Sequence, residues 1–247
     1  MDDSLRKFSN LNRLDLTVED WGQITRVSKT KSGNVTVFFD NLETSLIELI
    51  SQANAVIGCV ALLTNDQIFL AMSQKPASLI VQKEDFLRPD KVSKPELHRL
   101  YHNLDNAGHL YPNDFMVGGM GVNMQAIASG LNLNLHVNML DSVRCLGNVR
   151  KGKAQAEALM HHKFLVFCQF EGALDEDSRI AIPYAVWTGS FNLTWNGTRS
   201  LENAVLIEDR SVAEAYTEEF LYLYAFSEKL NWESEWVEET SKFFSSS

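Results

Sequence analysis

The sequence lacks the features that mark membrane-spanning and disulfide-stapled proteins. No stretch approaches the roughly 20 apolar residues that a transmembrane helix needs, and residues 1–16 have neither an apolar core nor a cleavage-like site. The three cysteines are odd in number, far apart and embedded in apolar runs: Cys59, Cys145 and Cys168. We therefore expect a cytoplasmic protein with reduced thiols packed as small hydrophobes, no membrane partner, no disulfide framework and no zinc site.

Positive charge is also scarce. The chain has 22 lysines and arginines against 32 acidic residues, which gives a net charge of -10. Residues 201–247 alone carry -8, because they hold eleven acids and three bases, so the acidity is concentrated in the last part of the chain. An acidic chain argues against charge-driven coating of nucleic acid, although a local groove can still be basic.

The hydrophobic pattern of the first third predicts a β-α-β unit. Residues 34–40 alternate and are rich in β-branched and aromatic side chains, residues 41–53 place apolar side chains at helical spacing, and residues 55–63 form an apolar run typical of a buried strand. In 247 residues with 45% hydrophobic content, this unit predicts an α/β fold: a mixed, largely parallel β-sheet flanked by helices.

Further elements are predicted along the rest of the chain. Residues 78–82 and parts of 133–146 have strand patterns. Capping boxes at Ser93 and at Ser211 predict the starts of two helices, and Gly108 is expected to end the first of these.

Residues 160–168 are the most informative segment, because a polar cluster is followed by an apolar run. This pattern predicts a strand that enters the core. Residues two apart on a strand share a face, so His161 and Lys163 should project together, whereas His162 and Cys168 should point to the opposite side. The spacing therefore places an imidazole beside an ammonium.

A second polar group follows at the same spacing. Residues 185–192 again read as a strand that ends in a glycine, with Ser190 and Asn192 two residues apart. Ten residues further on, Glu202 stands where a polar stretch turns into an apolar run. One site could collect these side chains together with His161 and Lys163.

Taken in order, three segments resemble the phospholipase D superfamily: residues 161–163, residues 188–192 and residues 202–207. The likeness is to its bacterial endonucleases, which carry a single His-x-Lys motif. One departure from the family pattern is Cys168, which stands where the motif usually has an aspartate five residues after the lysine.

The resemblance implies one domain over residues 1–247, divided into segments of different likeness. It is strong over 142–226, weaker over 34–85, and absent from 1–33 and 86–141. We interpret 86–141 as an insertion between the β-α-β start and the motif. Residues 227–247 form an acidic C-terminal tail.

The family likeness also implies a reaction that needs no metal and no cofactor. His161 would attack phosphorus to give a covalent phosphohistidine, with Glu202 holding the proton on the other ring nitrogen. Lys163 and Asn192 would bind the non-bridging oxygens, and Ser190 would assist through its hydroxyl. A second histidine must protonate the leaving group, and His161 of a second copy is the natural source, so a homodimer is implied.

Three functions follow from these residues. The first is a nuclease that hydrolyses DNA or RNA. The second is a phospholipase or phosphatidyl transferase, disfavoured by the lack of an interfacial amphipathic helix with a basic face. The third is a catalytically weakened nucleic-acid-binding module, which the cysteine at 168 favours and the retained His161 and Lys163 disfavour.

Overall fold

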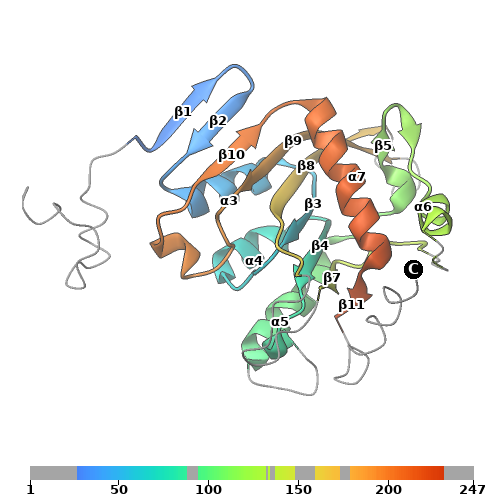
Figure 1. Cartoon of the computed structure of the whole chain (residues 1–247), viewed down its shortest axis with the longest axis horizontal. Helices are drawn as coiled ribbons and strands as arrows, with labels where there is room; N and C mark the ends of the chain where they lie inside the picture. The colour runs from blue at the N-terminus through green and yellow to red at the C-terminus, as the bar shows by residue number, and fades with distance from the viewer. Residues whose placement is uncertain are drawn as a thin grey trace, which may run out of the picture.

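A computed structural model describes residues 27–87, 94–131, 133, 137–147, 159–172 and 179–230. They form a mixed α/β structure in which helices cover both faces of one nine-stranded sheet (Figure 1). From one edge to the other, the strands are β1 (Lys29–Ser32), β2 (Val35–Phe38), β10 (Ala204–Ile207), β9 (Arg179–Gly189), β8 (Lys163–Gly172), β3 (Ala55–Val60), β4 (Ala77–Gln82), β7 (Val143–Leu146) and β11 (Glu228–Lys229).

The helices and short elements lie in the connections between these strands. The α-helices are α3 (Leu42–Gln52), α4 (Asp66–Met72), α5 (Pro95–Asn103), α6 (Met124–Gly130) and α7 (Arg210–Phe226). The 3-10 turns are η1 (Asp85–Leu87), η2 (Leu104–Ala107), η3 (Pro112–Asp114) and η4 (Gly197–Arg199), and a small hairpin joins β5 (Met116–Val117) to β6 (Met120–Gly121). No helix in the described part of the chain has the length and apolar character needed to cross a bilayer.

The sheet confirms the predicted mixed α/β class but not its predominance of parallel pairing. Only β3–β4 and β4–β7 are parallel, which is two of the eight neighbouring pairs. The expected β-α-β unit exists as β2, α3 and β3, but β10, β9 and β8 lie between its two strands. A local pattern indicates that a helix joins two strands, whereas which strands become neighbours is decided by pairing between distant segments.

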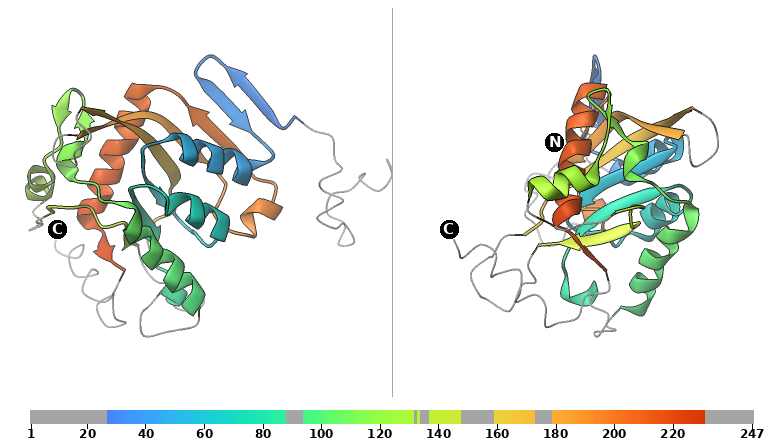
Figure 2. Two further views of the ribbon diagram at one scale, coloured as in Figure 1. Left: turned by 180° about the vertical axis from the view of Figure 1, so that it is seen from behind. Right: turned by 90° about the vertical axis from the view of Figure 1, so that its right-hand side faces the viewer.

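The core has two layers, one on each face of the sheet. On β8, Leu165 and Phe167 join the cluster under α3 and α4, whereas Phe164, Val166 and Cys168 join the cluster under α7. Figure 2 shows α7 on one side of the sheet and α3, α4 and α5 on the other. The alternation predicted from the sequence for this strand is therefore confirmed.

Strand β3 is buried along its whole length and lies very close to β8. A Cβ atom at Gly58 would lie 2.3 Å from the carbonyl oxygen of Phe164, so only glycine allows this approach. All three cysteines are buried free thiols, in agreement with the sequence prediction.

The capping box predicted at Ser211 is wrong in position. Helix α7 is capped by Asp209, whose side chain accepts hydrogen bonds from the Val212 amide at 3.1 Å and from the Ser211 hydroxyl at 2.6 Å. Helix α5 begins after Lys94, which makes no side-chain cap, and Ser93 lies outside the described residues. At α7 two good capping residues lie close together, and the short connection from β10 selects the first.

Candidate active site

Three segments of the predicted site meet where the inner strands β8, β9 and β10 begin or end, along one side of the sheet. Strand β8 begins there, the antiparallel β9 ends there, and β10 begins there (Figure 1). The register pairs Phe164 with Thr188 and Gly189 with Ala204, so the residues just outside these pairs lie at the same end. Antiparallel pairing of neighbouring strands thus gathers polar groups that are far apart in the sequence.

His161 and Lys163 lie side by side, as their spacing predicts. The Lys163 Nζ atom is 3.2 Å from Nδ1 and 3.4 Å from Nε2 of the exposed His161 ring, and it donates to the His161 carbonyl at 3.2 Å. An ammonium can donate only to an unprotonated ring nitrogen, so this contact suits a neutral imidazole.

Hydrogen bonds of the backbone fix the residues on either side of His161. The amide of Met160 donates to Gln82 Oε1 at 2.7 Å, and the amide of Ala61 donates to the carbonyl of His162 at 2.8 Å. The residues before and after His161 are therefore tied to the ends of β4 and β3. The histidine is exposed but stands on an anchored segment.

Electrostatics link Lys163 to the second polar segment. Burial lowers the pKa of the Lys163 ammonium, and the nearby Glu202 carboxylate opposes this shift by favouring the charged form. The two side chains thus interact across the strand ends even though 39 positions separate them in the sequence.

Ser190, Glu202 and Asn203 form the second part of the site. The Ser190 hydroxyl contacts the Glu202 carboxylate and lies 2.9 Å from Asn203 Oδ1. The backbone amide of Asn203 donates a hydrogen bond to Ser190 Oγ at 3.1 Å. A Cβ atom at Gly189 would lie 2.3 Å from the Asn203 carbonyl oxygen, so the glycine permits this close approach. Asn203 was not among the predicted site residues. Its position directly after Glu202, at the mouth of β10, was the available signal.

Asn192 is half-buried in the loop that follows β9. Among the described residues its Oδ1 atom is buried and has no hydrogen-bond partner. Because Oδ1 is enclosed by the protein, the amide nitrogen is the atom of this side chain that can donate to a ligand. Leu193 fixes the loop, since its amide donates to Leu62 at 3.1 Å and its carbonyl accepts from Thr64 at 2.9 Å.

His162 and Cys168 lie on the other face, as the strand alternation predicts. His162 Nε2 is 3.4 Å from Oε1 of Glu219 on α7, and its ring meets that of Phe164 at 5.8 Å between centroids. Cys168 is fully buried, and burial raises the pKa of its thiol, so the thiol stays protonated. Neither side chain is on the face that carries Lys163.

The residues on these segments provide a ring nitrogen, a cation, a hydroxyl, a carboxylate and an amide. Such a set can bind an anionic group through Lys163 and Asn192 while an imidazole attacks it. Within the described ranges, no three His, Cys, Asp or Glu side chains gather closely enough to hold a metal ion.

Comparisons with known proteins give one family match and one curated relative. A family described as "Cardiolipin synthase, PLD-like domain" matches residues 116–224, a span that includes all the predicted site residues. "Uncharacterized protein L381" of Acanthamoeba polyphaga mimivirus is 34% identical over 237 residues, which cover 92% of this chain and 76% of that protein.

Two solved structures show a distant likeness. NucT from Helicobacter pylori is 12% identical with a TM-score of 0.43, over 79% of this chain and 97% of that one. Nuc from Salmonella typhimurium, described as a phospholipase D family member, is 13% identical with a TM-score of 0.45, over 80% of this chain and 98% of that one.

Proposed function

Because the chain belongs to the phospholipase D superfamily, we propose that it is a metal-independent phosphodiesterase whose substrate is a nucleic acid. The observation that carries this proposal is the contact between the Lys163 ammonium and the His161 ring, at the edge where Ser190 and Glu202 also meet. A nucleophile and an anion-binding cation thus share one small, accessible area.

The first step of the proposed reaction breaks the phosphodiester bond. A ring nitrogen of His161 attacks phosphorus while the bond to the leaving oxygen breaks, which gives a phosphohistidine. Lys163 and the amide nitrogen of Asn192 bind the non-bridging oxygens, where negative charge must be stabilised. Glu202 holds the proton on the other ring nitrogen, and Ser190 orients the Glu202 carboxylate.

The reaction also requires a proton donor that later becomes a base. In the first step the same group acts as an acid and gives a proton to the leaving oxygen. In the second step it acts as a base and takes a proton from the water that displaces His161 from phosphorus, general acid–base help worth about 10²–10⁴ in rate. The adjacent His162 contacts Glu219 on the opposite face of β8, which makes it a poor candidate. We assign this role to His161 of a second copy, in a two-fold symmetric homodimer.

Nucleic acid is favoured over lipid by the surface of the longest helix. A lipid-directed enzyme must attach to a bilayer, commonly through a helix with a basic polar face. The polar side of α7 instead carries Glu214, Glu218 and Glu219, and its basic residue is Arg210 at the first position. An anionic bilayer would repel this side, whereas a dissolved polymer needs no such anchoring surface.

The test is hydrolysis in the presence of EDTA. Wild-type protein is offered DNA, RNA, phosphatidylcholine vesicles and bis-p-nitrophenyl phosphate, beside His161→Ala and the control His162→Ala. We expect hydrolysis of nucleic acid and of the small diester, a loss of about 10³-fold or more in His161→Ala, and retained activity in His162→Ala. Activity that EDTA abolishes, or that survives in His161→Ala, would contradict the mechanism.

The shared site has its own test. When wild-type protein is mixed with an excess of His161→Ala and allowed to exchange subunits, activity should fall with the square of the wild-type fraction, because each site needs two histidines. Light scattering of the same samples reports the oligomeric state. A fully active monomer would exclude the shared site.

A further inference from the structure

The loop between β9 and β10, residues 190–203, carries an exposed tryptophan between the two halves of the site. Ser190 and Asn192 stand at its start and Glu202 at its end. Trp195, near its middle, is 51% exposed. The Arg199 guanidinium lies 4.7 Å from the centre of its ring. Figure 1 shows this loop, in brown-orange, at the edge of the sheet where β10 begins and beside α4.

Hydrogen bonds hold Trp195 in a defined place. The Gly197 amide donates to Thr194 Oγ1 at 3.0 Å, and the Thr198 hydroxyl donates to the Trp195 carbonyl at 2.8 Å. A Cβ atom at the buried Gly197 would lie 2.2 Å from the Asn192 carbonyl oxygen, so the turn is folded tightly against Asn192. The aromatic ring is thus presented by a compact turn.

The turn is also anchored beneath its exposed side. Phe191 and Leu193, on either side of Asn192, are both buried at 2% exposure in the core cluster that includes α3 and α4. The backbone that carries the exposed side chains of the loop is therefore fixed by buried neighbours.

We propose that Trp195 is a stacking platform for a base of a single-stranded nucleic acid that crosses the site. This inference rests on the proposed function. Trp195 lies three positions after Asn192, so their Cα atoms are at most about 11 Å apart. A phosphate bound by Asn192 and Lys163 would place a neighbouring base within reach of the ring.

A single strand suits this platform better than a duplex. The faces of the bases are hidden in a duplex but accessible in a single strand, and stacking on an aromatic ring tolerates any base sequence. The net charge of -10 weakens long-range attraction to phosphates, so stacking gains importance over charge. Arg199 adds a local positive charge and supports the ring from one side.

The rival occupant is a membrane surface, since tryptophan also favours bilayer interfaces. Leu201, 54% exposed, is the other large apolar side chain exposed on this loop. Two side chains give little insertion energy, and the acidic chain is repelled by anionic lipid. Vesicles are therefore included below as an opposing outcome.

The experiment measures binding in the absence of cleavage. Fluorescence anisotropy of a labelled short oligothymidylate is followed with His161→Ala protein that carries Trp195→Ala, Trp195→Leu or Trp195→Phe. We expect Trp195→Ala and Trp195→Leu to weaken binding about tenfold, as loss of one stacked base does, and Trp195→Phe to retain most of the affinity. Tyr222→Ala removes an exposed aromatic side chain from α7 and serves as the matched control with unchanged binding.

Three results would overturn the platform. The first is that every Trp195 variant binds oligothymidylate as tightly as the protein that retains Trp195. The second is that Trp195→Leu retains the affinity as well as Trp195→Phe does. The third is Trp195-dependent binding to phosphatidylglycerol–phosphatidylcholine vesicles in place of the oligonucleotide. A duplex of the same length should bind more weakly, with no dependence on Trp195.

Hydrolysis separates this inference from the proposed function. In protein that retains His161, Trp195→Ala should raise KM for a single-stranded oligonucleotide about tenfold with little change in kcat. Absence of any hydrolysis of nucleic acid and of bis-p-nitrophenyl phosphate by wild-type protein would refute the phosphodiesterase, while Trp195-dependent binding would still support the platform. Hydrolysis with no effect of Trp195 on either KM or binding would refute the platform alone.

Discussion

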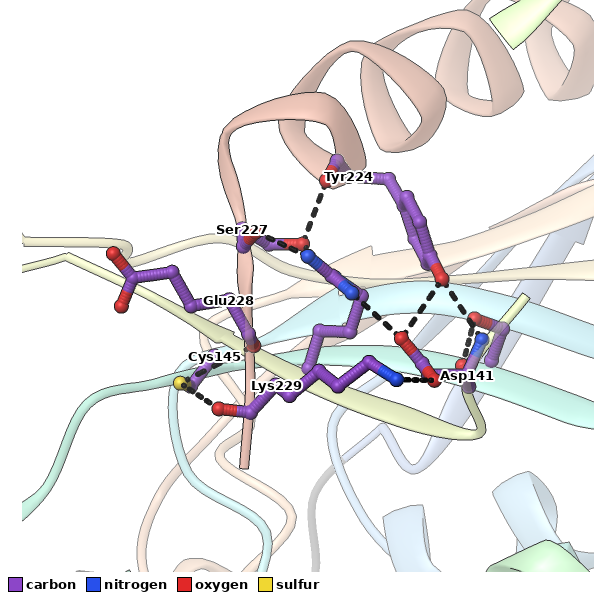
Figure 3. Close-up of polar contacts among 8 residues, drawn as sticks. Asp141, Cys145, Tyr224, Ser227, Glu228 and Lys229 are labelled. Carbon is purple, nitrogen blue, oxygen red and sulfur yellow. Dashed lines mark hydrogen bonds and ion pairs between the residues drawn. The ribbon is translucent and has the colours of Figure 1, made fainter. Parts of the chain in front are cut away.

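Two polar clusters lie at different places on the same sheet, and they differ in how completely they are satisfied. The α7–β7 network consists of Arg144 and three residues that Figure 3 labels, Asp141, Tyr224 and Ser227. Arg144 donates to Ser227 Oγ and to Asp141 Oδ2, both at 2.6 Å, and its guanidinium lies 4.7 Å from the centre of the Tyr224 ring. The Tyr224 hydroxyl in turn accepts from the Asp141 amide at 2.8 Å.

The candidate active site is open by comparison. His161 and Ser190 are exposed, and the buried Oδ1 of Asn192 has no partner among the described residues. A closed and buried network fixes the position of a helix end, whereas an open and exposed cluster keeps bonding capacity for a ligand. Substitutions in the site should therefore reduce activity and spare stability, and those in the network should do the reverse.

The largest effect is expected from Lys163→Met. Removing the cation that stabilises the phosphoryl oxygens should lower kcat for bis-p-nitrophenyl phosphate about 10³-fold, with the melting temperature nearly unchanged. The control is Lys31→Met, which removes an exposed lysine paired with Glu208 and should leave kcat as it is. A large fall in stability in Lys163→Met would place this lysine with the structural cluster.

Arg144→Met should have the opposite profile. The variant removes the closer of the two cations beside Asp141, since Lys229 stays 3.6 Å from it, and leaves the Ser227 carbonyl without its guanidinium donor. This should reduce the free energy of unfolding by about 3 kcal/mol in urea titrations. Arg210→Met, which breaks an exposed pair with Glu214, should cost less than about 1 kcal/mol. Activity per folded molecule should stay near wild type in both, and an inactive but stable Arg144→Met would break the comparison.

Ser190→Ala tests a contact inside the site. It removes the hydroxyl between Glu202 and Asn203, so we expect an activity loss of about tenfold, the effect of one hydrogen bond. Ser200→Ala, in the same loop, removes a hydroxyl that bonds to the Asn196 carbonyl and should change activity little. Equal activities of the two variants would show that the Ser190 contact has no part in the reaction.

Alkaline titration is the mildest way to separate the two clusters. The lowered pKa of Lys163 means that its charge is lost as pH rises through a value below the ordinary lysine range of about 10.4. Burial raises the pKa of Tyr224 to about 12, so the network keeps its protons there. Activity should fall before near-ultraviolet circular dichroism changes, and a simultaneous loss of both signals would contradict the difference.

Much of the site could be predicted because strand alternation is a local property. The sequence alone places His161 and Lys163 on one face and His162 and Cys168 on the other, and the contacts of His162 with Glu219 agree with this. The polar residues at the end of β9 and at the start of β10 could also be predicted, because at each position a polar stretch adjoins an apolar run.

Other features depend on pairing that no local pattern contains. The hairpin of β1 and β2 was not anticipated, since the exposed residues of β1 have no apolar alternation. The position of β10 between β2 and β9 is set by register with two distant segments. The role of Asn203 likewise follows from the close approach at Gly189, which only the folded pairing reveals.

Strand β8 is the fifth of nine in the sheet order. Because β8 carries Lys163, the site can form only when this central strand has paired with its neighbours. Its partner β9 follows it in the chain, but its other partner, β3, lies about a hundred residues earlier, with Val60 opposite Lys163. Contacts so distant in sequence form late, and central strands exchange their amide hydrogens slowest. Recovery of phosphodiesterase activity after dilution from denaturant should therefore lag behind secondary structure and coincide with protection of the β8 amides.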